Sequence, residues 1–119
     1  MKKLVEMKFH YDVEDDVLSI YADVAPSEVV EVSEFVNVDI NKDKGIVGLG
    51  IFEASEFFSI NDIGKSFLEG LKSLSLEYVE LRGTLFVKVN FVGSDGVVVS
   101  SQLPSFRKSE YECPLICGE

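Results

Sequence analysis

The sequence predicts an antiparallel α+β fold, with β-meanders of about six or seven strands and one main α-helix packed on the sheet. Hydrophobic and polar residues alternate along most of the chain, which is the period of a strand with one buried face. At about residues 60–73 the period changes to steps of three and four, as in an amphipathic helix. Turns containing Gly, Asn and Asp separate the alternating segments, so neighbouring strands are expected to pair as hairpins.

Length and composition fit one domain. The chain has 119 residues, of which 46% are hydrophobic and 11% aromatic, and this is enough to bury a core. We expect a single domain at residues 1–104 and a C-terminal tail at residues 105–119, because Pro104 ends the last strand pattern. The sequence shows no signal peptide, and no apolar run approaches the ~18 residues of a membrane span. A cytoplasmic protein is therefore expected.

The chain is strongly acidic, with 21 Asp and Glu against 11 Lys and Arg and a formal net charge of -10. Such a field repels phosphate backbones and anionic lipid head groups, so neither nucleic acid nor a membrane is expected as a partner. A small basic protein would be attracted, although a surplus of acidic residues also serves solubility alone.

The first half of the chain predicts two hairpins. Residues 5–11 and 17–23 alternate on either side of an acidic turn. Residues 35–41 and 45–53 alternate around an Asn-Lys-Asp-Lys-Gly turn, and the acidic segment before them is expected to be a loop or a short edge strand. In the second of these hairpins Gly48 and Gly50 lie two residues apart, so they leave one face bare and open to a helix, a ligand or another backbone, of which we expect a helix.

The second half of the chain predicts the helix and a further meander. After the helix at about 60–73, strands are expected at residues 76–81, 84–92 and 97–101. The run from Leu85 to Val92 is apolar on both sides, which predicts a central strand buried on both faces. An oligomer interface is the other interpretation of this run.

Two groups of residues could hold a metal. Asp12, Glu14 and Asp16 in the acidic turn could present oxygen ligands to calcium or magnesium, but the turn lacks the mid-loop Gly and closing Glu of a calcium loop. A solvated hairpin turn is the alternative. Cys113 and Cys117 lack the second ligand pair of a structural zinc site, so free thiols are expected. We predict no cofactor.

His10, Tyr21 and Asp39 are the candidates for acid–base catalysis. Together with Ser19 and Asn37 they fall on the polar side of the two hairpins and would meet if the hairpins pair. Alternation alone, however, places polar residues on every solvated sheet face. No nucleophile, oxyanion donor or phosphate-binding loop accompanies these residues.

The first half of the chain also resembles a known family. The residues that carry the resemblance are Phe9-His10-Tyr11-Asp12, Glu14, Asp16, Leu18-Ser19-Ile20-Tyr21, Val38-Asp39-Ile40-Asn41, Gly45 and the run from Ile46 to Ser55. Over about residues 7–55 they are similar to the family catalogued as domain of unknown function 2283, although Gly50 stands where that family usually has Glu. The resemblance implies a small cytoplasmic prokaryotic protein without an assigned activity, and it suggests an antitoxin-like or partner-binding role.

These observations favour a non-enzymatic protein-binding or assembly module. We expect it to form a homodimer through a sheet edge or the helix face, or to bind a small basic protein. The alternative is a metal-dependent or acid–base enzyme that uses the polar face of the N-terminal hairpins. A third interpretation is a mimic of nucleic acid that captures basic partners through its charge.

Overall fold

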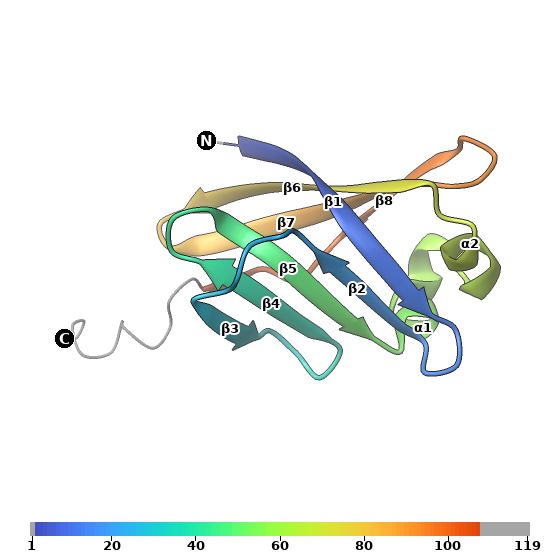
Figure 1. The fold of residues 1–119 in the computed structure, drawn as a ribbon, viewed down its shortest axis with the longest axis horizontal. Coiled ribbons are helices and arrows are strands. Elements are labelled where there is room, and N and C mark those ends of the chain that lie inside the picture. Colours follow the sequence, from blue (N-terminus) through green and yellow to red (C-terminus); the bar gives the residue numbers. More distant parts are fainter. Residues whose placement is uncertain (1, 108–119) are drawn as a thin grey trace.

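The computed structural model describes residues 2–107, which are mostly antiparallel strands (Figure 1). The strands are β1 (Lys2–Asp12), β2 (Val17–Tyr21), β3 (Glu28–Glu31), β4 (Val36–Asn41), β5 (Gly45–Phe52), β6 (Ser73–Leu81), β7 (Thr84–Val92), β8 (Val98–Gln102) and β9 (Phe106–Arg107). The helical segments are α1 (Ala54–Phe57), the 3-10 turn η1 (Ser59–Asn61) and α2 (Lys65–Glu69). The strand order is β3-β4-β5-β2-β1-β6-β7-β8, and β9 also pairs with β7.

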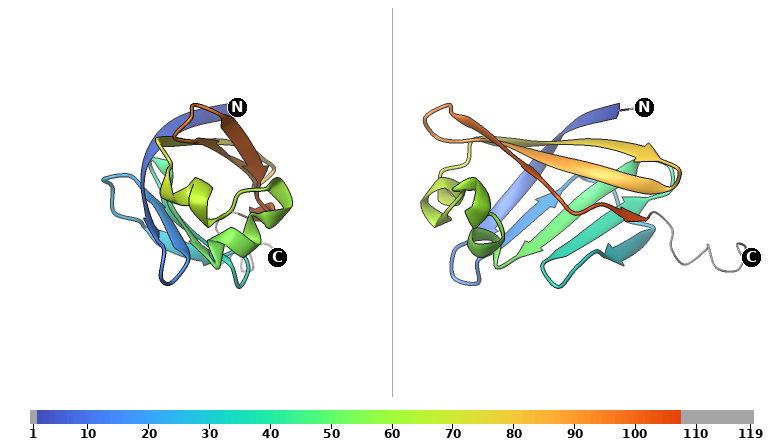
Figure 2. Two further views of the ribbon diagram at one scale, coloured as in Figure 1. Left: turned by 90° about the vertical axis from the view of Figure 1, so that its right-hand side faces the viewer. Right: turned by 180° about the vertical axis from the view of Figure 1, so that it is seen from behind.

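Strand β1 belongs to two layers. Its first part, residues 2–7, pairs with β6, and its second part, residues 8–12, pairs with β2. We call the layer of β6 to β9 with the first part of β1 sheet A, and the layer of β2 to β5 with the second part of β1 sheet B. Figure 2 shows the two sheets facing each other, with α1 and α2 at one end of the space between them.

The core fills the space between the sheets. In β4, Val36, Val38 and Ile40 are buried and alternate with partly exposed polar residues. Most other strands repeat this pattern, although residues 46–49 of β5 are all buried, and each sheet has one inner and one outer face. The fully buried side chains include Leu18, Ile20 and Ile51 from sheet B, Leu74, Leu76, Val87, Val89 and Phe91 from sheet A, and Phe58, Ile63 and Leu68 from the helical segment.

The predicted α+β fold with a main helix at about residues 60–73 is wrong. Residues 73–81 form β6, and the helical residues fall into three short segments. Asp62 has a positive φ angle of 61° and Gly64 is extended, and together they separate η1 from α2. Its apolar residues recur at three and four positions because these turns cap the end of the sandwich, and not because they form one continuous helix.

The predicted hairpins are confirmed. Strands β1 and β2 pair around the acidic turn, and β4 and β5 pair around the turn before Gly45. The acidic segment between the hairpins contributes the short edge strand β3. Of the predicted tail, Phe106 and Arg107 form β9, and residues 108–119 with both cysteines lie outside the described residues. No helix within residues 2–107 is long and apolar enough to cross a membrane.

Strand β7 is not buried on both faces. Leu85, Val87, Val89 and Phe91 point into the core, whereas Phe86 on the opposite face is 38% exposed. The prediction of burial on both sides is therefore wrong. It failed because the outer face of sheet A also carries apolar residues, which the alternation pattern could not separate from core residues.

The glycine pair in β5 is not covered by a helix in the described structure. Gly48 and Gly50 lie on the outer face of sheet B, whereas the helices lie at the end of the sandwich (Figure 1). A Cβ atom at Gly48 would lie 2.7 Å from Asp39 Oδ2 and 3.2 Å from the carbonyl oxygen of Ile20. Gly48 is therefore required by the packing of Asp39, and the predicted role in helix packing is wrong.

The two glycines should differ in their response to alanine. We expect Gly48→Ala to lower the free energy of unfolding by about 1–2 kcal/mol, because the new methyl group overlaps Asp39 and crowds a backbone carbonyl. Gly50→Ala should leave stability within about 0.5 kcal/mol or raise it slightly, because its Cβ would come no closer than 3.8 Å to the Phe52 ring. Urea unfolding followed by circular dichroism measures both, and equal effects would contradict the packing argument.

Candidate functional site

The acidic turn is joined to the start of α1 by a group of hydrogen bonds. Asp16, which has a positive φ of 57°, accepts a hydrogen bond from the Tyr11 hydroxyl. The Ser55 N–H donates to Asp16 Oδ1 at 3.1 Å, and the Ser55 hydroxyl donates to Oδ2 at 2.7 Å. The Ala54 N–H donates to the Asp16 carbonyl at 2.8 Å. This Tyr11–Asp16–Ser55 junction ties the first hairpin to the helical segment.

The hydrogen bonds at the junction determine its protonation. Burial opposes the charged form of Asp16, but the hydrogen bonds from Tyr11 and Ser55 outweigh burial and lower the pKa of this carboxyl below its ordinary value. Burial and the hydrogen bond to Asp16 raise the pKa of the Tyr11 phenol. Asp16 is therefore held as a carboxylate and Tyr11 as a neutral donor.

The three carboxylates predicted as metal ligands point to different partners. Asp12 Oδ1 accepts the Asp15 N–H at 3.1 Å, Asp16 faces Tyr11 and Ser55, and Glu14 is exposed. Within residues 2–107 there is no group of three His, Cys, Asp or Glu side chains that could hold a metal ion. This geometry supports the alternative interpretation, in which the acidic turn is a structural hairpin turn.

The candidate catalytic residues share one face without meeting. The register places His10, Ser19, Gly50 and Asn37 in one row across the outer face of sheet B. The next row contains Tyr21, Gly48 and Asp39. His10 and Asp39 are three strands apart, about 14 Å at the usual strand spacing, which is too far for a direct hydrogen bond. The structure thus brings these residues to one surface but forms no acid–base pair from His10 and Asp39.

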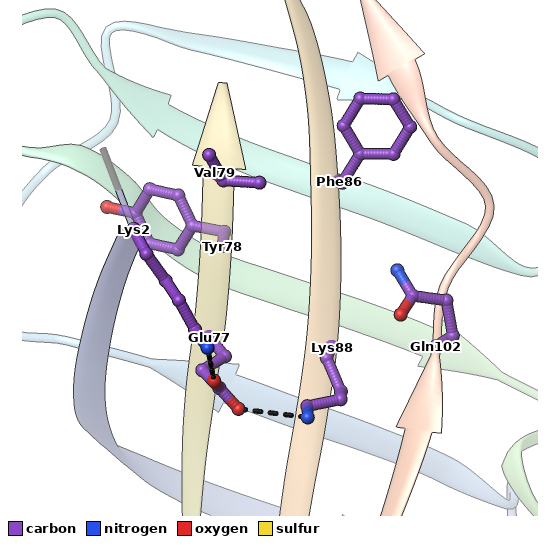
Figure 3. A pocket seen from close by; sticks show the side chains of 7 residues that line it. All are labelled: Lys2, Glu77, Tyr78, Val79, Phe86, Lys88 and Gln102. Atoms are coloured by element: carbon purple, nitrogen blue, oxygen red, sulfur yellow. Dashed lines mark ion pairs between the residues drawn. The ribbon is translucent and has the colours of Figure 1, made fainter. Parts of the chain in front are cut away.

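Sheet A carries a second candidate site, which the sequence did not reveal. An open pocket of about 250 Å³ lies on its outer face (Figure 3). Its lining residues are Lys2, Glu77, Tyr78, Val79, Phe86, Lys88 and Gln102. They come from four strands that lie side by side, β1, β6, β7 and β8.

Glu77 is the centre of the polar part of this pocket. Its carboxylate lies 2.7 Å from Lys2 Nζ and 3.2 Å from Lys88 Nζ (Figure 3), and Asn90 Nδ2 donates to it at 3.3 Å. Hydrogen bonds from Lys2, Asn90 and Lys88 lower the pKa of Glu77 to about 2. The carboxylate is therefore charged throughout the physiological range, and both lysines are held beside the apolar part of the pocket.

Apolar side chains surround these charges. Leu4 is 68% exposed, Leu81 56% and Phe86 38%. The register aligns Lys2, Val79 and Phe86 in one row, and Leu4 lies beside Glu77 in the next row. We call Leu4, Val79, Leu81 and Phe86 the sheet A patch. In the sequence this patch was indicated by the apolar residues on both sides of β7. A strand buried on both faces would have the same pattern.

Comparison with known proteins matches residues 8–55 to a family model. Neither a curated protein nor a solved structure matches the chain. The matched segment, residues 8–55, covers sheet B and the start of α1, and so contains the whole Tyr11–Asp16–Ser55 junction, whereas the strands β6 to β9 of sheet A lie beyond it. The resemblance seen in the sequence is confirmed, because residues 8–55 match the family described as protein of unknown function (DUF2283).

Proposed function

We propose that this protein is a non-enzymatic assembly module that binds a second copy of itself through the sheet A patch. The observation that carries the proposal is the exposure of Leu4, Leu81 and Phe86 on one side of three adjoining strands. Apolar side chains that gather on one surface are typical of protein interfaces. Their burial between two copies would remove them from water and stabilise the pair.

The charges of this face also favour a second copy. Lys2, Lys88 and Arg107 lie on it together with Glu6 and Glu77, so positive and negative groups nearly cancel. The whole chain, by contrast, has a net charge of -10. Two copies that met elsewhere would bring acidic surfaces together. A two-fold interface must complement itself, and a surface with both charge signs around an apolar patch satisfies this requirement.

Light scattering after size-exclusion chromatography tests the proposal. We expect the chain to have twice its own mass at high concentration and to dissociate on dilution. Leu4→Glu should weaken the dimer at least about tenfold, because it places a charge in the buried surface at its most exposed apolar residue. Leu81→Glu, at the edge of the same patch, provides a second variant in case Leu4→Glu impairs folding.

Ile60→Glu is the matched control. Ile60 is 88% exposed on η1, at the end of the sandwich and not on the outer face of sheet A, and its replacement changes the net charge by the same amount. It should dimerise like the unmodified protein, and the thermal midpoints of all variants show whether folding is retained. A chain that stays monomeric at every concentration, or equal effects of Leu4→Glu and Ile60→Glu, would exclude this interface.

A further inference from the structure

We propose that the outer face of sheet B is a separate binding surface for an extended, arginine-containing segment of another protein. This face lies in a different layer from the sheet A patch, so it would stay open in the proposed dimer. Its residues include those predicted from the sequence as catalytic candidates. The structure arranges them as a recognition surface rather than as an acid–base pair.

The first reason is the shape of this face. Gly48 lies between Tyr21 on β2 and Asp39 on β4, and Gly50 lies between Ser19 and Asn37. Gly48 has no side chain, so the Asp39 carboxylate lies over it and leans across β5 toward Tyr21: a Cβ atom at Gly48 would be 2.7 Å from Asp39 Oδ2. The Phe52 ring borders Gly50 in the same way, at 3.8 Å from the position of a Cβ atom. The glycines thus bring a carboxylate and aromatic rings together on this face.

The second reason is the exposure of large apolar side chains around the glycines. Tyr21 is 42% exposed, Val29 50% and Phe52 38%. Tyr21 and Val29 lie in the row of Gly48, and Phe52 lies beyond Gly50 on β5. No element of residues 2–107 packs over this face, since the helices lie at the end of the sandwich (Figure 2). The face therefore offers contact area that the fold itself does not use.

The third reason is charge. Asp39 and Glu31 lie on adjacent strands of this face, and within the described chain neither side chain has an ion pair or hydrogen bond. Lys8, at the other side of the face, is already paired with Asp23 at 2.5 Å. The face thus presents uncompensated carboxylates in a chain with a net charge of -10, which attracts a basic partner.

Arginine fits this arrangement better than lysine does. A guanidinium group on the outer side of the Asp39 carboxylate could stack on the Tyr21 ring and donate two hydrogen bonds to that carboxylate. Its planar fork suits both contacts at once, whereas a lysine ammonium acts as a point charge. The side chains of Ser19 and Asn37 beside Gly50 would supply hydrogen bonds to the peptide groups of the segment. The partner is therefore an extended basic segment with arginine at alternate positions.

Fluorescence anisotropy with a labelled ten-residue peptide of alternating arginine and threonine tests this inference. We expect saturable binding that weakens with salt. Asp39→Asn should weaken it about tenfold or more, because a charge-assisted double hydrogen bond is lost. Tyr21→Ala should weaken it about threefold to fivefold through loss of stacking. The corresponding lysine peptide should bind less tightly than the arginine peptide to the unmodified protein.

Asp43→Asn is the matched control for charge. Asp43 is exposed in the turn between β4 and β5, and its replacement changes the net charge as Asp39→Asn does. Its effect on peptide binding should stay below about twofold. The Leu4→Glu variant should bind the peptide like the unmodified protein, so that failure of the proposed dimer and failure of this inference can be told apart.

Backbone amide shifts in NMR spectra locate the bound peptide. Changes at Gly48 and Gly50 support the inference, whereas changes confined to sheet A overturn it. Absence of saturable binding at low salt also overturns it. Equal effects of Asp39→Asn and Asp43→Asn would show attraction by the overall charge alone, and equal affinity for the arginine and lysine peptides would rule out recognition of a guanidinium group.

Discussion

Replacement of Phe58 with alanine is expected to lower the free energy of unfolding by about 4 kcal/mol, the largest effect of any single change considered. Phe58 is fully buried where the helical segment meets the core. Its ring centroid lies 5.1 Å from that of Phe57 and 5.1 Å from that of Phe91, in edge-to-face geometry with both. The substitution leaves a cavity and removes two aromatic contacts. Urea unfolding followed by circular dichroism measures the loss.

Phe52→Ala is the matched control for this change. It removes the same ring from a position that is 38% exposed on the outer face of sheet B, and it should cost less than about 1 kcal/mol. Phe58→Leu retains most of the buried volume and should give an intermediate value. If Phe58→Ala and Phe52→Ala shifted the unfolding midpoint equally, Phe58 would not anchor the helical segment to the core.

Asp16→Ala is expected to cost about 3 kcal/mol, which would make it the largest effect of a polar residue considered. The variant removes the acceptor of the Tyr11 hydroxyl and of both Ser55 donors, and it forces alanine into a left-handed conformation. The expected result is separation of the first hairpin from α1 together with a lower global stability. Thermal and urea unfolding measure the global loss, and amide hydrogen exchange at Ser55 measures the local one.

Asp15→Ala is the neighbouring control, since the Asp15 side chain is exposed and outside the junction. Its effect should lie within about 0.5 kcal/mol. Asp16→Asn tests the charge itself. The pKa of Asp16 is lower in the folded state than its ordinary value of 3.8. The stability supplied by the charge is therefore complete above pH 3.8 and is lost as the pH falls through the lower folded value.

The difference in stability between the unmodified protein and Asp16→Asn should accordingly be constant near neutral pH and shrink below pH 3.8. Urea titrations at a series of pH values measure this difference. If the difference in free energy of unfolding stayed constant at the lowest pH values, the charge of the Asp16 carboxylate would contribute no stability. An effect of Asp15→Ala as large as that of Asp16→Ala would show that the turn acts through its total charge.

The sequence predicted the strands well and the helical segment poorly, for identifiable reasons. Alternation in β2 and β4 is regular because each of these strands has one inner and one solvated face, whereas β5 has four consecutive buried residues and a register shift against β4. The segment from Ala54 to Gly70 has helical spacing of apolar residues, but the positive φ angle of Asp62 and the extended backbone of Gly64 divide it. Local spacing alone could not distinguish three short turns that share one core from a single helix.

The candidate sites could be predicted only in part. Alternation correctly assigned Tyr21 and Asp39 to the polar face of the hairpins, but it carries no information on how many strands separate His10 from Asp39. The pocket around Glu77 depends on the pairing of β1 with β6, which joins segments about seventy residues apart in sequence. Such a long-range pairing leaves no local pattern, so the structure was needed to show this site.

The division of β1 between the two sheets has a consequence for the order of folding. Pairing of β1 with β2 closes only a short turn, whereas pairing of its first residues with β6 closes a loop that contains all of sheet B. Closure of the longer loop costs more chain entropy. Because β6 and β7 also pair around a short turn, we infer that the hairpins of both sheets form first and that the pairing of the first part of β1 with β6, which joins the sheets, follows. The N-terminal residues of the chain would thus be among the last to reach their native positions.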